Sequence, residues 1–356
     1  MKKKAYLNLF QDPLSGKRIK GWIISPDNFI EHPQYGTVYF LDWQKKKSEF
    51  PLVGDKTWRN YRVELEVFPV SRNGYLGVNF HVQPDSSACN FHFPIQESGR
   101  NEAFQSMCIW GKSCAWKLYP ESQGYALLPS GEWLSLCIDV TETFSNLYVQ
   151  NSSKPILTLF DLPFNCGGIQ FWSFLGSSYF RNLRVTELLP ATARLAFDNP
   201  WKIYNKLGVI RKWRVTMPQK SDFGLTGIPE ILFSTEMKWL DVEGDRRGVI
   251  NLSSLFPGNN TKASVFAKTI IMSDKKEKRT CRLTYTDRFT IWCNDKLIFE
   301  GPPRGWDDPG RETHFGGRLI PDEFEVKIAL NSGENIILIR SEVTEPWGWG
   351  FWMRVD

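Results

Sequence analysis

The sequence predicts an all-β protein made of two antiparallel β-sandwich domains. Three observations predict this class. Hydrophobic side chains alternate with polar ones at every second position, which is the period of a strand. Segments with this pattern recur at short intervals between clusters of Gly, Pro, Asn, Asp and Ser. No segment shows the periodicity of a long helix, and the 356 residues correspond to roughly two domains of about 150 residues.

In the first half, the clearest alternation is in residues 61–67, and residues 78–82 repeat it. Further candidate strands are residues 90–93, 133–140, 146–150, 168–174 and 179–185. Turn clusters are expected at residues 71–74, 84–87, 129–131 and 151–153. Strands at this spacing favour two antiparallel sheets packed face to face.

A break follows at residues 188–195, and Pro200-Trp201 begins a new segment. Residues 198–220 are compatible with an extended lead-in or a short helix. The strand pattern then returns at residues 248–252, 263–272, 280–285, 289–293, 296–299, 324–330, 335–341 and 350–355. We therefore predict a first domain over residues 1–190 and a second over residues 191–356.

The composition excludes several classes of protein. With 42% hydrophobic and 14% aromatic residues, the chain is too apolar to be disordered. Seven cysteines without a CxxC pair make neither a disulfide-rich scaffold nor a zinc ribbon. No apolar run approaches the roughly 20 residues that cross a bilayer, so we expect no membrane partner.

The charge is mildly basic, with 44 Lys and Arg against 39 Asp and Glu. The basic runs are short, at residues 2–4, 45–47 and 275–279, and we interpret all three as solvated turns. A nucleic-acid partner is therefore not expected, because such binders usually concentrate basic charge on one face.

The N-terminus begins with three lysines, but Asn8, Gln11, Asp12 and Pro13 follow too soon for the apolar region of a signal peptide. We expect a cytoplasmic protein. Secretion is the expectation only if a signal was removed and replaced by a new Met.

In the first half, the order of four segments resembles concanavalin A-like (laminin G-like) lectin and glucanase domains: residues 61–67, 77–82, 131–140 and 179–185. Residues 96–105, followed by 113–119, look like a bacterial branch of that group without assigned chemistry. The resemblance covers about residues 5–188 and implies a jelly-roll sandwich.

In the second half, residues 287–299 resemble the "D-x-hydrophobic-x-V-W-x-N-G-K" hairpin of galactose-binding-like jelly rolls. Asp295 replaces the usual Gly, but an Asn-Asp pair still tolerates the left-handed backbone of a hairpin turn. Residues 327–339 and 349–355 look like further strands of these domains. The resemblance covers about residues 200–356, and such domains bind sugars in some proteins and brace a neighbour in others.

Glu64 and Glu66 are the first candidates for chemistry. They are two positions apart on one predicted strand, so both project from the same face. Glycosidases need two carboxyl groups across a scissile bond. Laminarinase-type enzymes of the resembling fold carry three acids on a longer strand, and Phe68-Pro69 breaks that pattern here. We favour a solvent-facing position with Arg62 nearby for charge balance.

His81 and His92 are the second candidates, and each alternates with apolar neighbours. If residues 84–88 form a loop, their strands pair antiparallel, with both histidines and Asn79 and Asn90 on the polar face. Two imidazoles there could bind a metal, take a proton or hydrogen-bond sugar hydroxyls. No third metal ligand is evident, and the alternative is that neighbouring groups satisfy both histidines.

Aromatic side chains in loops are the strongest indication of ligand binding. Trp110, Trp116, Tyr119 and Tyr125 fall in an irregular region, and loops carry function more often than core strands do. Aromatic rings can stack on the C–H face of a sugar while polar groups bind its hydroxyls.

A second loop, residues 304–318, mixes aromatic and charged side chains. Its candidate ligand-binding residues are Arg304, Trp306, Asp307, Asp308 and His314. In the resembling jelly rolls this loop lies near the final hairpin, which here carries Trp347 and Trp349. The alternative is that the Trp residues plug the end of the sandwich while Asp–Arg pairs hold the loop.

Motifs for other chemistry are missing from the sequence. There is no G-x-S-x-G elbow and no phosphate loop before a helix. No D-x-D-x-D-G calcium loop occurs, and the most acidic turn, residues 241–245, is followed by Arg246 and Arg247. We expect no cofactor, with a structural Ca²⁺ as the one possible exception.

These observations favour a two-domain protein that recognises carbohydrate by aromatic stacking and polar contacts and has no catalytic centre of its own. One alternative is a glycoside hydrolase or lyase whose acid and base come from Glu64, Glu66, Asp307 or Glu312. A second alternative is a protein–protein scaffold, because Trp and Tyr also dominate protein interfaces.

Overall fold

The computed structural model describes residues 7–14, 22–23, 26–44, 52–95, 104–111, 113–189, 204, 206–220, 227–258, 262–304 and 318–356. The chain forms two compact units. The first unit holds residues 1–109 and 122–198, and the second holds residues 110–121 and 199–356. The predicted boundary at residue 190 lies outside the described residues.

The predicted all-β class is confirmed, because every strand pair in the described part of the chain is antiparallel. The α-helix described there, α1 (Leu252–Leu255), is a single turn that Asn251 caps through its side chain. No helix of the described residues is long and apolar enough to span a membrane.

Sheet 1 of the first unit has the strand order β14-β13-β12-β6-β16-β4-β3, with β1 added beside β16. Its strands are β1 (Asn8–Asp12), β3 (Phe29–His32), β4 (Gly36–Asp42), β6 (Tyr61–Pro69), β12 (Leu134–Val140), β13 (Phe144–Val149), β14 (Leu157–Phe160) and β16 (Ser177–Glu187). The short 3-10 helix η1 (Pro26–Asn28) precedes β3.

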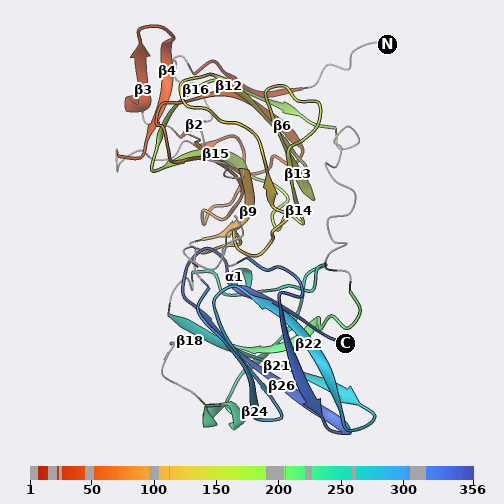
Figure 1. The fold of residues 1–356 in the computed structure, drawn as a ribbon. Helices are drawn as coiled ribbons and strands as arrows, with labels where there is room; N and C mark the ends of the chain where they lie inside the picture. Colours follow the sequence, from red (N-terminus) through yellow and green to blue (C-terminus); the bar gives the residue numbers. More distant parts are fainter. Residues whose placement is uncertain are drawn as a thin grey trace. The chain divides into compact units, whose positions relative to one another are not determined.

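Sheet 2 of the first unit has the order β9-β8-β7-β15-β5-β2, with β11 beside β9. Its strands are β2 (Trp22–Ile23), β5 (Leu52–Val53), β7 (Tyr75–Val82), β8 (Ala88–Pro94), β9 (Phe104–Trp110), β11 (Gln123–Gly124) and β15 (Gly168–Phe174). Figure 1 shows β6, β12 and β16 in one layer of this unit and β9 and β15 in the other.

Alternation explains this sandwich. In β6 every second residue from Tyr61 to Val67 is buried, and sheet 2 buries Phe80, Phe91 and Phe171. Each such side chain contributes roughly 1.5–3 kcal/mol when it leaves water. Residues of the other parity point away from this core. We call the surfaces that they form the outer face of sheet 1 and the outer face of sheet 2.

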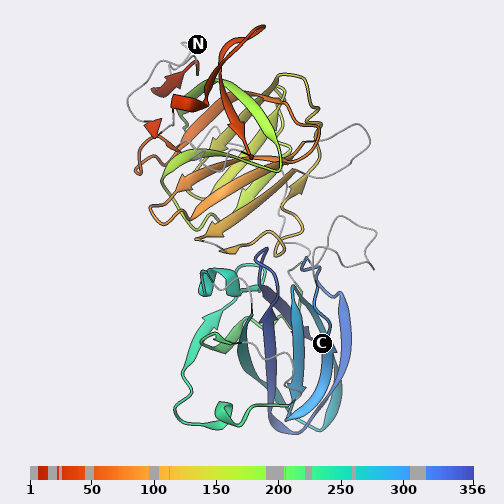
Figure 2. The ribbon, with the colours of Figure 1, turned by 90° about the vertical axis from the view of Figure 1, so that its left-hand side faces the viewer.

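The second unit contains two further sheets, and Figure 2 shows its strands coloured from green to blue. Sheet 3 has the order β19-β17-β21-β26-β23-β24, with β18 beside β21. Its strands are β17 (Lys212–Thr216), β18 (Gln219–Lys220), β19 (Trp239–Glu243), β21 (Ala263–Ser273), β23 (Arg288–Cys293), β24 (Lys296–Gly301) and β26 (Gly333–Val343). The 3-10 helix η4 (Glu230–Phe233) lies between β18 and β19 in the chain.

Sheet 4 has the order β20-β27-β22-β25. Its strands are β20 (Ile250–Asn251), β22 (Glu277–Tyr285), β25 (Phe324–Leu330) and β27 (Gly350–Val355), and β10 (Ser113–Cys114) also belongs to this unit. In the hairpin between β23 and β24, Asn294 and Asp295 have φ values of 49° and 63°. Both are left-handed, as a tight hairpin turn requires, and the predicted tolerance of the Asn-Asp pair is confirmed.

Candidate functional site

A row of rings crosses the outer face of sheet 2, and we call it the aromatic row. It consists of Trp172, His92, Tyr75, Phe174 and Trp43. Successive ring centroids are 5.6, 4.9, 6.4 and 4.6 Å apart. At one end Trp43 is 44% exposed and Phe174 is 37% exposed, while the other three are half-buried. The row therefore presents aromatic surface to solvent outside the sandwich core.

The strand register builds this row. Gly77 of β7 lies between Trp172 of β15 and His92 of β8, directly opposite both. A Cβ on Gly77 would lie 2.0 Å from Cε2 of Trp172. The missing side chain of Gly77 thus leaves room for the indole over β7, next to His92. This is the close-approach role in which glycine is found within strands.

A line of side-chain amides runs beside the aromatic row, and we call it the amide ladder. Asn79 donates from Nδ2 to Oε1 of Gln170 at 2.9 Å, and Asn90 donates from Nδ2 to Oδ1 of Asn79 at 2.7 Å. Asn79 and Asn90 are directly opposed in the register, so the predicted pairing of their strands is confirmed. Within the described residues, the buried Oδ1 of Asn90 accepts no hydrogen bond.

His81 does not continue this polar face. Gly168 pairs with Val82 and Ile169 with Phe80, so His81 is the extra residue of a bulge, with a φ of 49°. A bulge changes the side of the sheet on which a side chain lies.

The ring of His81 is engaged by backbone. Its Nδ1 is 2.7 Å from the carbonyl oxygen of Phe164, and its Nε2 is 3.1 Å from that of Arg59. Burial lowers the pKa of His81 more than these two carbonyls raise it. The ring ties three segments together, whereas His92 lies in the aromatic row.

The outer face of sheet 1 carries the predicted carboxylates. Glu66 and Arg181 form an ion pair of 2.5 Å, and Glu64 and Arg184 one of 3.9 Å. Both carboxylates project from the same face, as the strand period predicts, and each has an arginine of β16 opposite it. Glycoside hydrolysis needs two carboxyl groups that face each other across a gap. Glu64 and Glu66 do not face each other in this way.

Trp110, Trp116 and Tyr119 belong to the second unit. Trp116 is buried, and the Arg318 guanidinium carbon lies 4.4 Å from its ring centroid. The ring of Tyr119 is covered by Arg247 at 4.5 Å, and its hydroxyl donates to Asp245 at 2.9 Å. Trp110 packs on a cluster that contains Leu118 and Trp352. These rings are used by packing, whereas Tyr125 of the first unit is exposed.

Lys117 fixes the same segment within the second unit. Its side chain is fully buried, and Nζ lies 3.4 Å from Asp287 and 3.4 Å from Glu345. The ammonium also donates to the backbone oxygens of Thr286 and Arg304 at 3.3 Å. Residues 110–121 therefore contribute buried side chains and ion pairs to the second unit, although the rest of that unit begins at residue 199.

In the second predicted loop, Arg304 is buried and binds Glu323 through two hydrogen bonds of 2.7 and 2.9 Å. Trp347 is 44% exposed, and its carbonyl accepts from the backbone of Lys117. Trp349 is buried and donates to Ser341. The remaining predicted residues lie outside the described residues: Trp306, Asp307, Asp308, Glu312 and His314.

The acidic turn considered for calcium is occupied by the protein itself. Asp245 accepts backbone hydrogen bonds from Arg247 and Val249, and Asp241 pairs with Arg214 at 3.5 Å. In the part of the chain that is described, no group of three or more His, Cys, Asp or Glu could hold a metal ion.

Sequence reasoning missed the aromatic row except for His92. The signal was the alternation within residues 168–174, which assigns Gln170, Trp172 and Phe174 to the face opposite the buried Ile169 and Phe171. The register with β7 then brings Trp172 over Gly77. Trp43, which follows β4, has no periodic signal.

No family model and no curated protein matches the sequence. Among solved structures, the chain is similar to the carbohydrate binding module CBM66 from Bacillus subtilis, with a TM-score of 0.36 and 10% identity over 47% of this chain and 96% of the module.

A protein of unknown function with a galectin-like fold from Bacillus subtilis has a TM-score of 0.34 and 14% identity, over 51% of this chain and 96% of that one. Galectin LEC-6 from Caenorhabditis elegans has a TM-score of 0.30 and 14% identity, over 46% of this chain and 98% of the galectin.

Proposed function

We propose that the first unit binds a neutral carbohydrate on the outer face of sheet 2, and that it acts as a lectin-like module without a catalytic centre. The observation that carries the proposal is the aromatic row, from the half-buried Trp172 to the exposed Trp43, outside the core of a closed sandwich. A surface of contiguous rings of this kind marks a binding site more often than a packing position.

The chemistry of the face fits a sugar. Aromatic rings offer apolar faces to the C–H groups of a pyranose. In the amide ladder Asn79 and Asn90 are buried, and the half-buried Gln170 offers an uncharged amide, which suits hydroxyl groups.

The neutral character of the ladder supports a neutral ligand over an acidic one. Gln170, Asn79 and Asn90 carry no charge and hydrogen-bond one another. The finer assignments, a laminin G-like first domain and a galactose-binding-like second domain, are part of this proposal. So is carbohydrate as the partner.

The test is calorimetric titration of the full chain with a panel of neutral oligosaccharides. Trp172→Ala should weaken the binding of any retained sugar by about tenfold or more, since about 1.4 kcal/mol corresponds to a factor of ten.

Trp133→Ala is the matched control. Trp133 lies in the same unit, where Arg181 covers its ring at 3.9 Å. The proposal fails if no sugar binds, or if both variants lose affinity equally while circular dichroism shows both folded.

A further inference from the structure

A hollow of about 610 Å³ lies beside β17 in the second unit. It opens where β17 leaves β21: the two strands pair only at Arg214–Lys268 and Val215–Ala267, whereas β17 pairs with β19 along its whole length. Beyond that point, Thr269 donates from Oγ1 to the carbonyl of Lys212 at 3.0 Å. The volume is in the range of small-molecule sites.

Most of the wall surface of the hollow is apolar, although Lys212, Asp241 and Glu243 also line it. Trp213 is buried, with Nε1 donating to the carbonyl of Ile210 at 3.1 Å, and Val242 is half-buried beside it. Ile270 and Ile336 face each other across β21 and β26, and they are 56% and 49% exposed. A directly opposed pair of exposed isoleucines that lines a hollow is an apolar contact surface.

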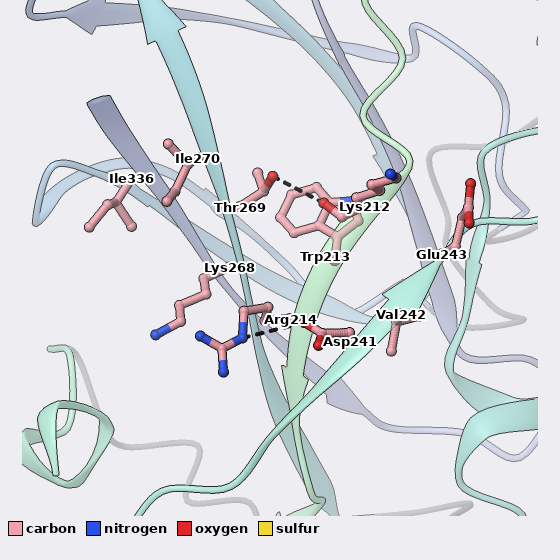
Figure 3. A pocket seen from close by; sticks show the side chains of 10 residues that line it. All are labelled: Lys212, Trp213, Arg214, Asp241, Val242, Glu243, Lys268, Thr269, Ile270 and Ile336. Atoms are coloured by element: carbon pink, nitrogen blue, oxygen red, sulfur yellow. Dashed lines mark hydrogen bonds and ion pairs between the residues drawn. The ribbon is translucent and has the colours of Figure 1, made fainter. Parts of the chain in front are cut away.

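Two cations stand together at the mouth, and Figure 3 shows Arg214 and Lys268 side by side. They are directly opposed across β17 and β21, an arrangement that is unfavourable for like charges. Arg214 has a counterion in Asp241, but the Asp241 side chain is 90% exposed, so water screens this pair.

Lys268 has a ring rather than an acid as its neighbour. Its Nζ lies 4.0 Å from the ring centroid of Trp239, and within the described residues no carboxylate forms an ion pair with it. Burial, and then the charge of Arg214, lower the pKa of Lys268. An anion held between Lys268 and Arg214 would offset both the desolvation of Lys268 and the repulsion between the two cations.

We propose that this hollow binds an aliphatic carboxylic acid, with the carboxylate between Lys268 and Arg214 and the hydrocarbon chain against Ile270 and Ile336. The walls favour a hydrocarbon over a sugar acid, because Thr269 already uses its hydroxyl hydrogen and most of the wall surface is apolar, although Lys212, Asp241 and Glu243 also line the hollow. The site lies in the second unit and does not depend on the carbohydrate proposal.

Calorimetry of the full chain with octanoate, octanol and glucuronate measures separately what the carboxylate and the hydrocarbon chain contribute to binding. Octanoate should bind one per chain, and octanol and glucuronate each at least fivefold more weakly. Lys268→Gln should weaken octanoate at least fivefold without changing octanol. Lys278→Gln, with the same change of charge at an exposed position of β22, should change neither.

If Lys268→Gln does not fold, Arg214→Gln repeats the test of the carboxylate contact. Ile270→Thr tests the hydrocarbon contact and should weaken the binding of octanoate and octanol together. The proposal is overturned if octanoate does not bind or binds equally to wild type and both cation variants. It is also overturned if glucuronate binds more tightly than octanoate, since that would show that the hollow prefers a polar ligand to a hydrocarbon chain.

Discussion

The two outer faces of the first unit use their side chains in different ways. On sheet 1, charged residues pair with each other: Glu66 with Arg181, Glu64 with Arg184, and Arg62 with Asp139. On sheet 2, the corresponding surface carries the neutral amide ladder and the aromatic row. Both faces were candidates for chemistry from their sequence alternation, and the pairing of their groups is what separates them.

Rings on the two faces differ in the same sense. On sheet 1, Trp133 has Arg181 at 3.9 Å over its ring, and its other neighbours are Tyr35 and Phe68. On sheet 2, Trp172 lies over a glycine, and the row ends at the exposed Trp43. A ring closed in by neighbours stabilises the fold, whereas a row that ends in solvent has surface left for a ligand.

The largest expected effect is on sheet 1. The Asp139 side chain is 1% exposed and receives two hydrogen bonds from Arg62, at 2.6 and 2.8 Å. Arg62→Met leaves a buried carboxylate without its partner, which costs roughly 3–5 kcal/mol for a fully buried pair. Because Arg62 is 40% exposed, we expect about 2–3 kcal/mol in urea unfolding.

Adding Asp139→Asn should restore part of this loss, because the second change removes the stranded charge. If Arg62→Met costs as little as an exposed ion pair, below about 1 kcal/mol, then charge pairing does not hold this face. The contrast between the two faces would then be one of composition only.

The next effect concerns Gly77 on sheet 2. A Cβ there would collide with the indole of Trp172 at 2.0 Å, so Gly77→Ala should lift the ring from the face. We expect carbohydrate affinity to fall about tenfold or more, which is about 1.4 kcal/mol. The free energy of unfolding should fall by less than the strain of about 1–3 kcal/mol that overpacking causes, because the lower entropy of the unfolded chain offsets part of that strain.

Gly227→Ala is the control, because a Cβ at Gly227 meets nothing within 4 Å and its φ is not left-handed. Unchanged sugar binding in Gly77→Ala would show that the position of Trp172 over Gly77 is not what the ligand needs.

The sequence predicts much of this contrast but not all of it. Alternation and a loop at residues 84–88 predict that the strands of Asn79 and Asn90 pair antiparallel with both amides on one face, and the structure places the two residues directly opposite each other. The bulge at His81 adds one residue without disturbing the apolar pattern around it, so alternation assigns its side chain to the wrong environment. Whether a side chain near a bulge faces core or ligand depends on backbone geometry that residue type does not encode.

Burial of the loop aromatics was also beyond the sequence. Trp116 is covered by Arg318, and Lys117 is paired with Asp287, at separations of about 170 to 200 positions in the chain. Irregular composition correctly indicates the absence of long strands at residues 113–122. It cannot indicate which distant elements pack on the segment, because these contacts are tertiary.

A smaller effect should follow acidification. Burial lowers the pKa of His81 in the folded protein, while the unfolded value is about 6.5. Below about pH 6.5 the unfolded chain therefore binds a proton that the folded chain does not. The contribution of neutral His81 to the free energy of unfolding is complete above that pH. It is lost as the pH falls towards the folded pKa, with a slope of at most about 1.4 kcal/mol per pH unit.

His81→Asn is the variant to compare, because asparagine tolerates the left-handed φ of 49° at this position. The difference in unfolding free energy between wild type and variant should shrink between pH 7.5 and 5. A difference that grows on acidification would mean that the two carbonyl groups around the ring hold it protonated.

The smallest effect is expected for the carboxylates of sheet 1. The ion pairs of Glu64 and Glu66 are both substantially exposed, so Glu64→Gln and Glu66→Gln should each change stability by less than about 1 kcal/mol. Sugar binding should not change, because the aromatic row lies on the other sheet. Release of reducing ends from a polysaccharide panel decides the hydrolase alternative. Product that the wild type forms and that either variant abolishes would make the outer face of sheet 1 catalytic, because an ion pair of purely structural use has no such effect.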